Sequence, residues 1–422
     1  MAPIRFPQHS DSFWLLGLFG ARVGASLTFM SFPAALPVLR EEWGLSGTAA
    51  GSISTVSSLA FTLSLVVLSS LADRVGARRV FLGSSILTVL AAYLIPVFAE
   101  GYRSGLFLFT LVALASGGTY TPGLMLVAER FPSDRRGWSM GWFLAAASLG
   151  YACSLTATGL MVSRFGWRAA LGVIATGSLI GAGLACWTLL PAPPPRSPRE
   201  PAPSSFTGGV LMNRPAVLLV VGYMFHSWEV LGMWAWTPAF LASALGGAQQ
   251  SIEGAAAQGA GLAALFHLMG LLATSVSGWL SDRWGRTGVI VLMMTVSTLC
   301  SFSFGWLAGA PLLIVLFVGL IYSFSAIGDS PVYSTALSEV VEPRHLGSAL
   351  AIRSLIGFGA GSLAPFAFGA VLDFTNRGVS DHQSLTWGWA YSLLGLGAAV
   401  GLFATLWLRR LPQSRLMAGG RR

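Results

Sequence analysis

Long apolar stretches alternate with short polar segments along almost the whole chain. A helix needs about 20 apolar residues to cross a hydrocarbon core that is roughly 30 Å thick. By that length the pattern predicts twelve membrane-spanning helices, at 13–39, 46–71, 79–98, 104–127, 138–162, 169–190, 215–241, 255–280, 288–308, 311–338, 346–372 and 386–408. Because the stretches lack strand-like alternation and are too long for barrel strands, the predicted fold class is all-α.

The composition agrees with a membrane protein, since 54% of the residues are hydrophobic and only 10% are charged. Every basic residue is an arginine, and the arginines are unevenly divided between the two sides of the membrane. With the N-terminus in the cytoplasm, 18 lie in cytoplasmic segments and five on the opposite side. We therefore expect both termini in the cytoplasm and the protein in a bacterial inner membrane, with no nucleic-acid partner.

The first apolar run is too long for a signal peptide and lacks a small-residue cleavage site, so we interpret it as the first helix. Cys153, Cys186 and Cys300 all fall inside predicted helices. They are interpreted as packing residues, and we expect no disulfide, metal site or cofactor.

One long polar segment, rich in proline and small residues, interrupts the chain after the sixth helix and is typical of a linker. It divides the chain into five parts. These are a cytoplasmic N-terminus at 1–12, a six-helix bundle at 13–190, the linker at 191–214, a second six-helix bundle at 215–408 and a basic cytoplasmic tail at 409–422.

The two halves repeat each other in sequence. The matching residues, 209 or 210 positions apart, are Asp73 and Asp282, Arg74 and Arg283, Gly76 and Gly285, Pro122 and Pro331, Glu129 and Glu339, and Gly137 and Gly347. Because six helices is an even number, both halves enter the membrane in the same orientation, related by an axis along the membrane normal. A cavity between them is the natural place for a solute.

The segment SLADRVGARRVF, Ser70–Phe81, and its copy WLSDRWGRTGVI, Trp279–Ile290, resemble the G-x-L-a-D-R-x-G-R signature of the major facilitator superfamily. AERFPSDRRG, after the fourth helix, resembles the next cytoplasmic loop of that family. The resemblance covers residues 13–408 and implies a secondary transporter that works by alternating access. One departure is Ser69, which stands where the family has its first glycine, whereas Gly278 keeps that glycine in the second copy.

The resemblance also implies a gate. Asp73 is expected to contact the start of the eleventh helix, near Gly347, when the cytoplasmic side is shut, which stabilises a carboxylate by roughly 0.3 to 1 kcal/mol. The arginines that follow can reach Glu129 or lipid phosphate, and the alternative is a solvated loop that only sets topology. The predicted gating residues are Asp73, Arg74, Gly76, Arg78, Glu129, Asp282, Arg283, Gly285 and Glu339.

Four charged residues, Arg22, Glu229, Asp329 and Arg353, lie deep inside predicted helices. A charge near the membrane centre costs about 2.5 to 3.5 kcal/mol, so these residues are expected to face a cavity or one another. The resemblance assigns the first, fourth, seventh and tenth helices to the cavity wall, together with Tyr120. An ion pair of Arg22 with Glu229 or Asp329 that only holds the halves together stays the alternative.

Spacing along the seventh and tenth helices suggests two polar faces. Their members are Tyr223, His226 and Glu229, and Tyr322, Asp329 and Tyr333. A packed histidine without a transport role is the alternative for His226. The predicted substrate-binding residues are Arg22, Tyr120, His226, Glu229, Tyr322, Tyr333 and Arg353, and the predicted proton-coupling residues are Asp329 and then Glu229.

Two arginines offer planar forks suited to a carboxylate, and two acids offer proton sites. The leading hypothesis is a monomeric, proton-coupled transporter of a small organic anion, with the anion, protons and the lipid bilayer as its partners. We expect Asp329 to lie near Arg22 and to take up a proton when the anion occupies that arginine.

The alternative function is a proton-driven exporter of drugs or amphipathic cations. The fourth helix lacks the arginine, and the fifth helix the Gly-Pro pair, of the superfamily's drug antiporters, which weakens that alternative. An enzyme is not expected, because the chain has no HExxH, nucleophile elbow or phosphate-binding glycine loop.

Overall fold

A computed structural model gives the fold and describes residues 10–190, 212–245, 250–342, 345–379 and 385–421. The first half contains α1 (Asp11–Ser26), η1 (Leu27–Phe29), α2 (Ser31–Glu42), α3 (Gly47–Val75), α4 (Ala77–Phe98), α5 (Tyr102–Ser116), η2 (Gly117–Thr119), α6 (Thr121–Arg130) and α7 (Ser133–Leu189). The second half contains α9 (Arg214–Leu245), α10 (Ile252–Trp284), α11 (Arg286–Phe304), η3 (Gly305–Leu307), α12 (Leu312–Val340), α13 (Leu346–Gly361), α14 (Ala364–Thr375), α15 (Gly388–Arg410) and η6 (Pro412–Gly420). The all-α prediction is confirmed.

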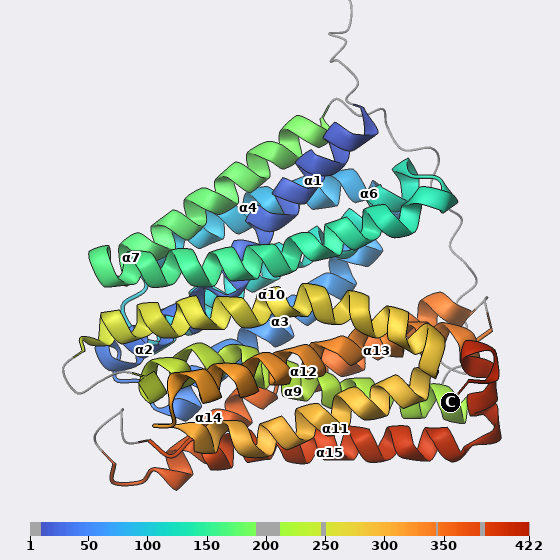
Figure 1. The fold of residues 1–422 in the computed structure, drawn as a ribbon. Helices are drawn as coiled ribbons and strands as arrows, with labels where there is room; N and C mark the ends of the chain where they lie inside the picture. Colours follow the sequence, from blue (N-terminus) through green and yellow to red (C-terminus); the bar gives the residue numbers. More distant parts are fainter. Residues whose placement is uncertain (1–9, 191–211, 246–249, 343–344, 380–384, 422) are drawn as a thin grey trace, which may run out of the picture.

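Eleven helical stretches among the described residues are long and apolar enough to cross a membrane. One of them, α7, is a hairpin of two passes. It spans 57 residues, but Gly166 has the non-helical dihedral angles φ 77° and ψ 170°, and the chain turns back there (Figure 1). The described part of the chain therefore makes twelve passes, as the hydrophobic pattern predicts.

Three passes are each built from two helices. The first pass is α1 and α2 joined by η1, the fourth is α5 and α6 joined by η2, and the eleventh is α13 and α14. Prolines explain two of these breaks, because Pro122 lies in the first turn of α6 and Pro365 in the first turn of α14. Proline is tolerated in a first turn, where its missing N–H is not needed.

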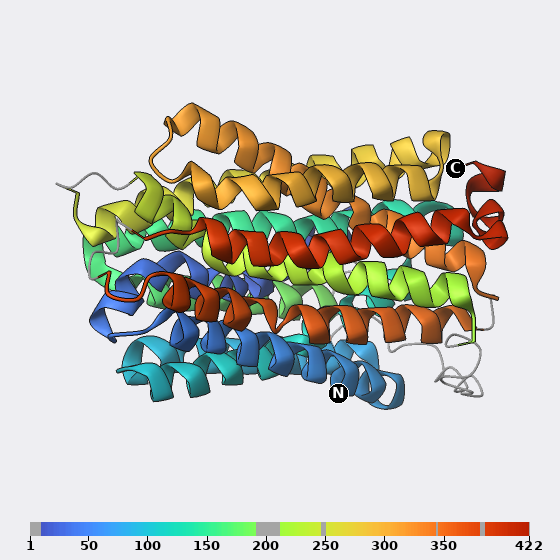
Figure 2. The ribbon, with the colours of Figure 1, turned by 90° about the horizontal axis from the view of Figure 1, so that it is seen from below.

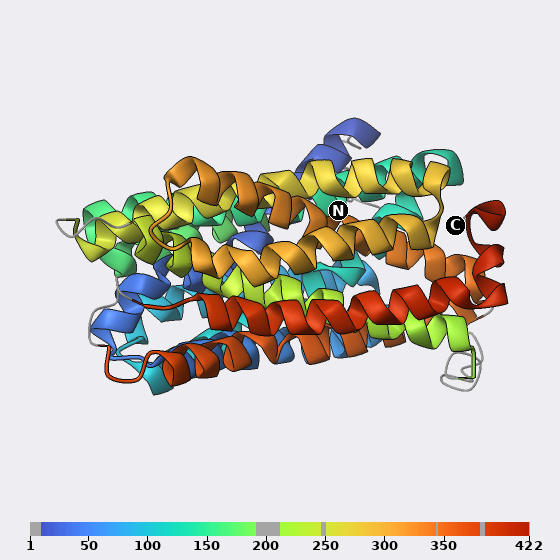
Figure 3. The same ribbon diagram turned by 60° about the horizontal axis from the view of Figure 1, so that its bottom comes forward.

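The long helices all run along one axis, as membrane passes do (Figures 2 and 3). They form two six-helix bundles, and most helices of the first bundle lie above the second in the view of Figure 1. The bundles separate toward the end where α1 begins and α15 ends (Figure 1). We call this the open end; by the arginine distribution it is the predicted cytoplasmic side.

The bundles touch closely at the opposite, closed end, where α3 crosses α14. A Cβ atom placed on Gly369 would lie 2.1 Å from the carbonyl oxygen of Gly47, and one on Gly51 would lie 2.2 Å from the carbonyl oxygen of Pro365. Larger residues at these two glycines would force the helices apart.

The predicted linker, 191–214, and the predicted N-terminal segment, 1–12, fall mostly outside the described residues, so the exact division into domains stays a prediction. The basic tail is described as far as Arg421 and folds back onto the open end of the second bundle. The backbone N–H of Ala418 donates to Glu339 Oε2 at 2.9 Å, and the guanidinium of Arg421 donates to the carbonyl of Asp282.

Candidate functional site

Arg22 lies on the buried face of α1. Its Nη1 donates a hydrogen bond to Thr119 Oγ1 at 3.1 Å, and its guanidinium lies 5.3 Å from the ring centre of Tyr120 and 5.5 Å from that of Phe143. Within the described chain its Nε has no hydrogen-bond partner and no carboxylate lies within ion-pair distance. A buried guanidinium with free donors is suited to an anionic ligand.

Arg353 lies on α13 in the second bundle and is held in a similar way. Its guanidinium lies 4.1 Å from the ring centre of Tyr223 and donates to Ser334 Oγ. Its Nε is buried and lacks a hydrogen-bond partner among the residues that the structure describes. Tyr120 is within electrostatic range of Tyr223 and of both Arg22 and Arg353. The two arginines, one from each bundle, therefore lie near one region between the bundles.

Asp329 of α12 and His226 of α9 form a buried pair. The distance from His226 Nδ1 to Asp329 Oδ1 is 2.7 Å, which is within ion-pair range, although neither atom has a hydrogen bond of good geometry in the described chain. The ring of Tyr223 stacks on His226 at 5.1 Å. The expected partner of Asp329 was Arg22, but the partner in this structure is His226. Arg353, Tyr223, His226 and Asp329 thus form a continuous row.

Glu229, Tyr322 and Tyr333 are buried inside the second bundle. Glu229 accepts hydrogen bonds from Ser297 Oγ at 2.9 Å and from Ser301 Oγ at 2.7 Å, and Ser301 also bonds to the hydroxyl of Tyr322. The hydroxyl of Tyr333 contacts α11 and α15. These contacts point toward α11 and α15, and the ring of Tyr333 also lies 6.1 Å from that of Tyr223 and 6.3 Å from that of His226. Within the described residues, no hydrogen bond or ion pair joins the three residues to the two arginines.

Helix geometry explains why the predicted face on α9 divides. A three-residue step along an α-helix leaves the side chain about 60° short of a full turn, so two steps turn it by about 120°. Tyr223 contacts Arg353, His226 contacts Asp329, and Glu229 has rotated toward α11. The expected shared face is therefore a spiral that leads from the space between the bundles into the second bundle.

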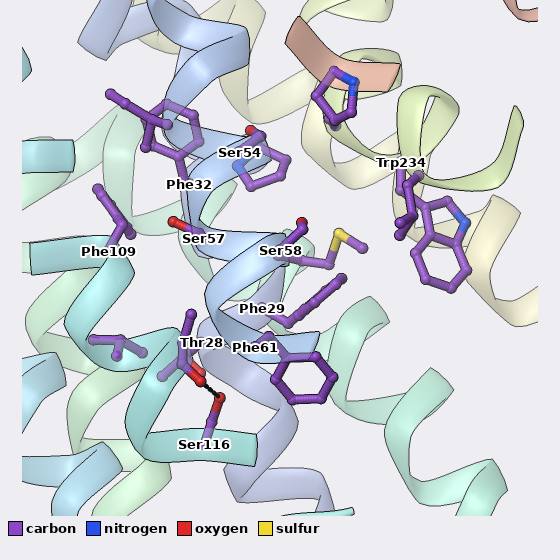
Figure 4. A pocket seen from close by; sticks show the side chains of 18 residues that line it. Thr28, Phe29, Phe32, Ser54, Ser57, Ser58, Phe61, Phe109, Ser116 and Trp234 are labelled. Atoms are coloured by element: carbon purple, nitrogen blue, oxygen red, sulfur yellow. Dashed lines mark hydrogen bonds between the residues drawn. The ribbon is translucent and has the colours of Figure 1, made fainter. Parts of the chain in front are cut away.

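A pocket lined mainly by aromatic and hydroxyl side chains lies between the η1 turn, α3, α5 and α9 (Figure 4). Its aromatic rings are Phe29, Phe32, Phe61, Phe109 and Trp234, and its hydroxyls are Thr28, Ser54, Ser57, Ser58 and Ser116. The sequence analysis did not find this pocket, because its lining residues come from separate passes. Thr119 and Phe143, which contact Arg22, were missed for the same reason.

The profile of the Major Facilitator Superfamily matches residues 18–365 of the chain, well over half of its length. The chain belongs to the major facilitator superfamily. Among its relatives, the probable 4-methylmuconolactone transporter of Cupriavidus pinatubonensis is 25% identical over 84% of this chain and 82% of that protein. The probable L-galactonate transporter of Escherichia coli is 24% identical over 94% of this chain and 89% of that protein.

Solved structures agree on the fold. The inward-facing, occupied structure of a bacterial homolog of the human lysosomal transporter Spinster superposes with a TM-score of 0.74. It covers 94% of this chain and 97% of that one at 16% identity, which supports the fold alone. This superfamily member is thus a multi-pass membrane transporter and not an enzyme.

The superfamily motif forms the same turn in both bundles. Gly76 follows α3 with φ 95°, and Gly285 follows α10 with φ 89°. Glycine adopts these positive values without strain, which is the physical reason for glycine at both positions. In the second copy the guanidinium of Arg283 lies 3.8 Å from the ring centre of Trp279.

The first copy of the motif makes few contacts in this superfamily member. Asp73, Arg74 and Glu129 are exposed and form no hydrogen bond or ion pair within the described residues. Arg78 donates to the carbonyl of Leu190 at 2.6 Å. The expected contact between the arginines of the loop and Glu129 is therefore not made in this structure.

The second copy does form such a network, through a residue that the sequence analysis did not single out. Arg286 Nη2 lies 2.8 Å from Glu339 Oε1, and Arg286 Nη1 also bonds to Asp282. The residue that corresponds to Arg286 in the first copy, 209 positions earlier, is Ala77. The first copy therefore lacks the arginine that would contact Glu129. The Arg286 network joins helices of one bundle, and the gating role of both motif copies stays a prediction.

Proposed function

We propose that this protein is a secondary transporter that moves a small organic anion across the membrane by alternating access. The observation that carries the proposal is the pair of deep arginines, Arg22 and Arg353, which lack a carboxylate partner among the described residues. Arg22 is buried and Arg353 is half-buried, and a buried charge without a counter-charge is costly, on the order of several kcal/mol. An anion between the two arginines removes that cost, and a carboxylate matches the guanidinium fork.

The arrangement of the bundles supports movement of such an anion. Each bundle contributes one arginine, and the bundles are closed at one end and apart at the other. Rocking of the bundles about the bound anion exposes the site to each side of the membrane in turn. We propose that the open end faces the cytoplasm of a bacterium, as the arginine distribution predicts.

We further propose that Asp329 couples transport to protons through His226. The row from Arg353 through Tyr223 and His226 to Asp329 joins the anion site to a carboxylate. An anion that binds Arg353 adds negative charge near the row, and uptake of a proton by the histidine–aspartate pair compensates for that charge. Anion and proton then load together.

Among the other predicted site residues, Tyr120 is a proposed substrate contact because its ring lies against Arg22. Glu229, Tyr322 and Tyr333 are proposed to support the site from inside the second bundle. Two relatives bear the names of a probable 4-methylmuconolactone transporter and a probable L-galactonate transporter, which favours an organic acid as the substrate.

Export of amphipathic cations is the competing function and would need a carboxylate free to meet the cation. Asp329 is paired with His226 and Glu229 with two serines, which weighs against it. The test is uptake into proteoliposomes of mono- and dicarboxylates and of cationic dyes, with and without a pH gradient. Gradient-driven accumulation of a carboxylate supports the proposal, and transport of cations alone overturns it.

A further inference from the structure

Five aromatic rings surround a pocket beside the proposed anion site. They are Phe29, Phe32, Phe61, Phe109 and Trp234 (Figure 4). Among the described residues, no acidic or basic side chain lines the pocket. The hydroxyl of Ser57 lines it, is buried and has no hydrogen-bond partner within the described residues. Such a lining favours an uncharged, flat group that carries at most a few polar atoms.

Thr119 connects this pocket to Arg22. Its Oγ1 accepts the hydrogen bond from Arg22 at 3.1 Å and donates to the carbonyl of Ser116, a lining residue, at 2.8 Å. Residues 117–119 form the η2 turn, so this one turn joins the lining residue Ser116 to the residue that holds Arg22.

Tyr151 makes a second connection between the anion site and the pocket. Its ring lies 5.1 Å from that of Phe29 and 5.6 Å from that of Trp234, and it is within electrostatic range of Arg22. Trp234 belongs to the second bundle and Phe29 to the first. The pocket, like the arginine pair, is therefore shared by both bundles.

We infer that the transported anion is a monocarboxylate that bears a planar ring, with its carboxylate on Arg22 and its ring among the five aromatic side chains. This inference rests on the proposed function. Burial of a ring against these side chains is favourable, whereas a polyhydroxylated acid would leave several hydroxyl groups without partners there. Ser57 can bond to one polar substituent on the ring.

Equilibrium binding to the detergent-purified full chain tests the inference with benzoate, acetate, glucuronate and benzamide. We expect benzoate to bind at least about tenfold more tightly than acetate and glucuronate, and at least about tenfold more tightly than neutral benzamide. Glucuronate binding as tightly as benzoate would overturn the inference and leave the proposed function standing. Benzamide binding as tightly as benzoate, or no binding by any of the three acids, would remove the proposed function as well.

A pair of phenylalanine variants locates the ring. Phe61→Ala removes a ring from the pocket and is expected to weaken benzoate binding about tenfold while acetate binding stays unchanged. Phe107→Ala, at an exposed position of α5 outside the pocket, is the matched control and should bind benzoate like the parent. Equal benzoate binding by both variants and the parent would contradict the placement of the ring.

Discussion

The carboxylate of Asp373, at the end of α14, caps the first turn of α3. Its Oδ1 accepts from the backbone N–H of Gly47 at 2.6 Å, and its Oδ2 accepts from the backbone N–H and the hydroxyl of Thr48 at 2.7 and 2.6 Å. A carboxylate at a helix N-terminus gains about 0.3 to 1 kcal/mol, and up to about 2 kcal/mol when partly buried. Asp373 therefore links the two bundles at the closed end.

The same two passes carry the opposite arrangement at their other end. There Asp73 lies at the end of α3, and α13 begins at Leu346. Only the Asp373 contact is made within the described residues, since Asp73 is exposed and unpaired. One crossing of α3 with α13–α14 thus has a carboxylate near a helix start at each end, and we propose that the two contacts belong to opposite states of the transporter.

The first prediction is that Asp373→Asn opens the closed end. Loss of the carboxylate removes the charge that binds two backbone N–H groups of α3, so the closed contact weakens. A cysteine placed at Ser57, in a background without native cysteines, should react faster with a membrane-impermeant maleimide added from that side. Glu100→Gln, an exposed change at the same end, is the control. Equal reaction rates in Asp373→Asn and the parent would show that the Asp373 contact does not hold the closed end together.

The second prediction concerns Asp73→Asn at the open end, and its expected effect on the reporter's reaction rate is opposite to that of Asp373→Asn. Asp73 is exposed and has no hydrogen bond or ion pair within the described residues, so its substitution should not destabilise this state. The substitution should destabilise the state in which the open end is closed. The population should therefore shift toward the state that this structure shows. The same Ser57→Cys reporter should then react more slowly from the closed-end side. An unaltered rate would leave the loop as a determinant of topology only.

The third prediction is that Gly369→Ala separates the bundles at the closed end without touching any charge. The new methyl group would lie 2.1 Å from the carbonyl oxygen of Gly47, so α14 must move away from α3. Accessibility of the Ser57→Cys reporter from that side should rise as it does in Asp373→Asn. Gly83→Ala, where a Cβ would meet nothing within 4 Å, is the matched control and should behave like the parent.

The membrane passes could be predicted from the sequence, because the length of an apolar stretch is a local property. The motif at Asp73–Gly76 and its repeat at Asp282–Gly285 indicated the family and the tight turns. It also found the deep arginines, since a charge in an apolar run is visible without a structure. The hydrogen-bond partner of Arg22 could not be predicted from the sequence, because Thr119 is 97 positions away along the chain.

The rotation of successive side chains about a helix axis also limited what the sequence could predict about the site. Glu229 was grouped with Tyr223 by three-residue spacing, yet the drift of about 60° per step turns it to Ser297 and Ser301. The contact of Asp373 with the first turn of α3 could not be predicted from the sequence either. Such a cap requires that the start of another helix lies opposite the acid in the fold, and neither the residues around Asp373 nor the internal repeat shows which helix that is.

The fourth prediction concerns the guanidinium of Arg22. Its Nη1 is held by Thr119, and its Nε is left without a partner within the described residues, so a carboxylate can bind side-on to the fork. Arg22→Lys keeps the charge but loses the planar fork, and carboxylate affinity should fall at least about tenfold. Arg164→Lys, at an exposed position of α7, is the control. Normal affinity in Arg22→Lys would contradict a bidentate contact.

The last prediction separates the two candidate proton sites. Asp329→Asn removes the carboxylate beside His226, so the mutant should still exchange substrate across the membrane but lose accumulation driven by a pH gradient. His226→Gln should share this phenotype, because we propose that the His226–Asp329 pair takes up the proton. Glu229→Gln keeps a hydrogen-bonding group between Ser297 and Ser301 and should still accumulate substrate. If Asp329→Asn concentrates substrate like the parent while Glu229→Gln does not, the coupling site is Glu229 and the histidine–aspartate pair is structural.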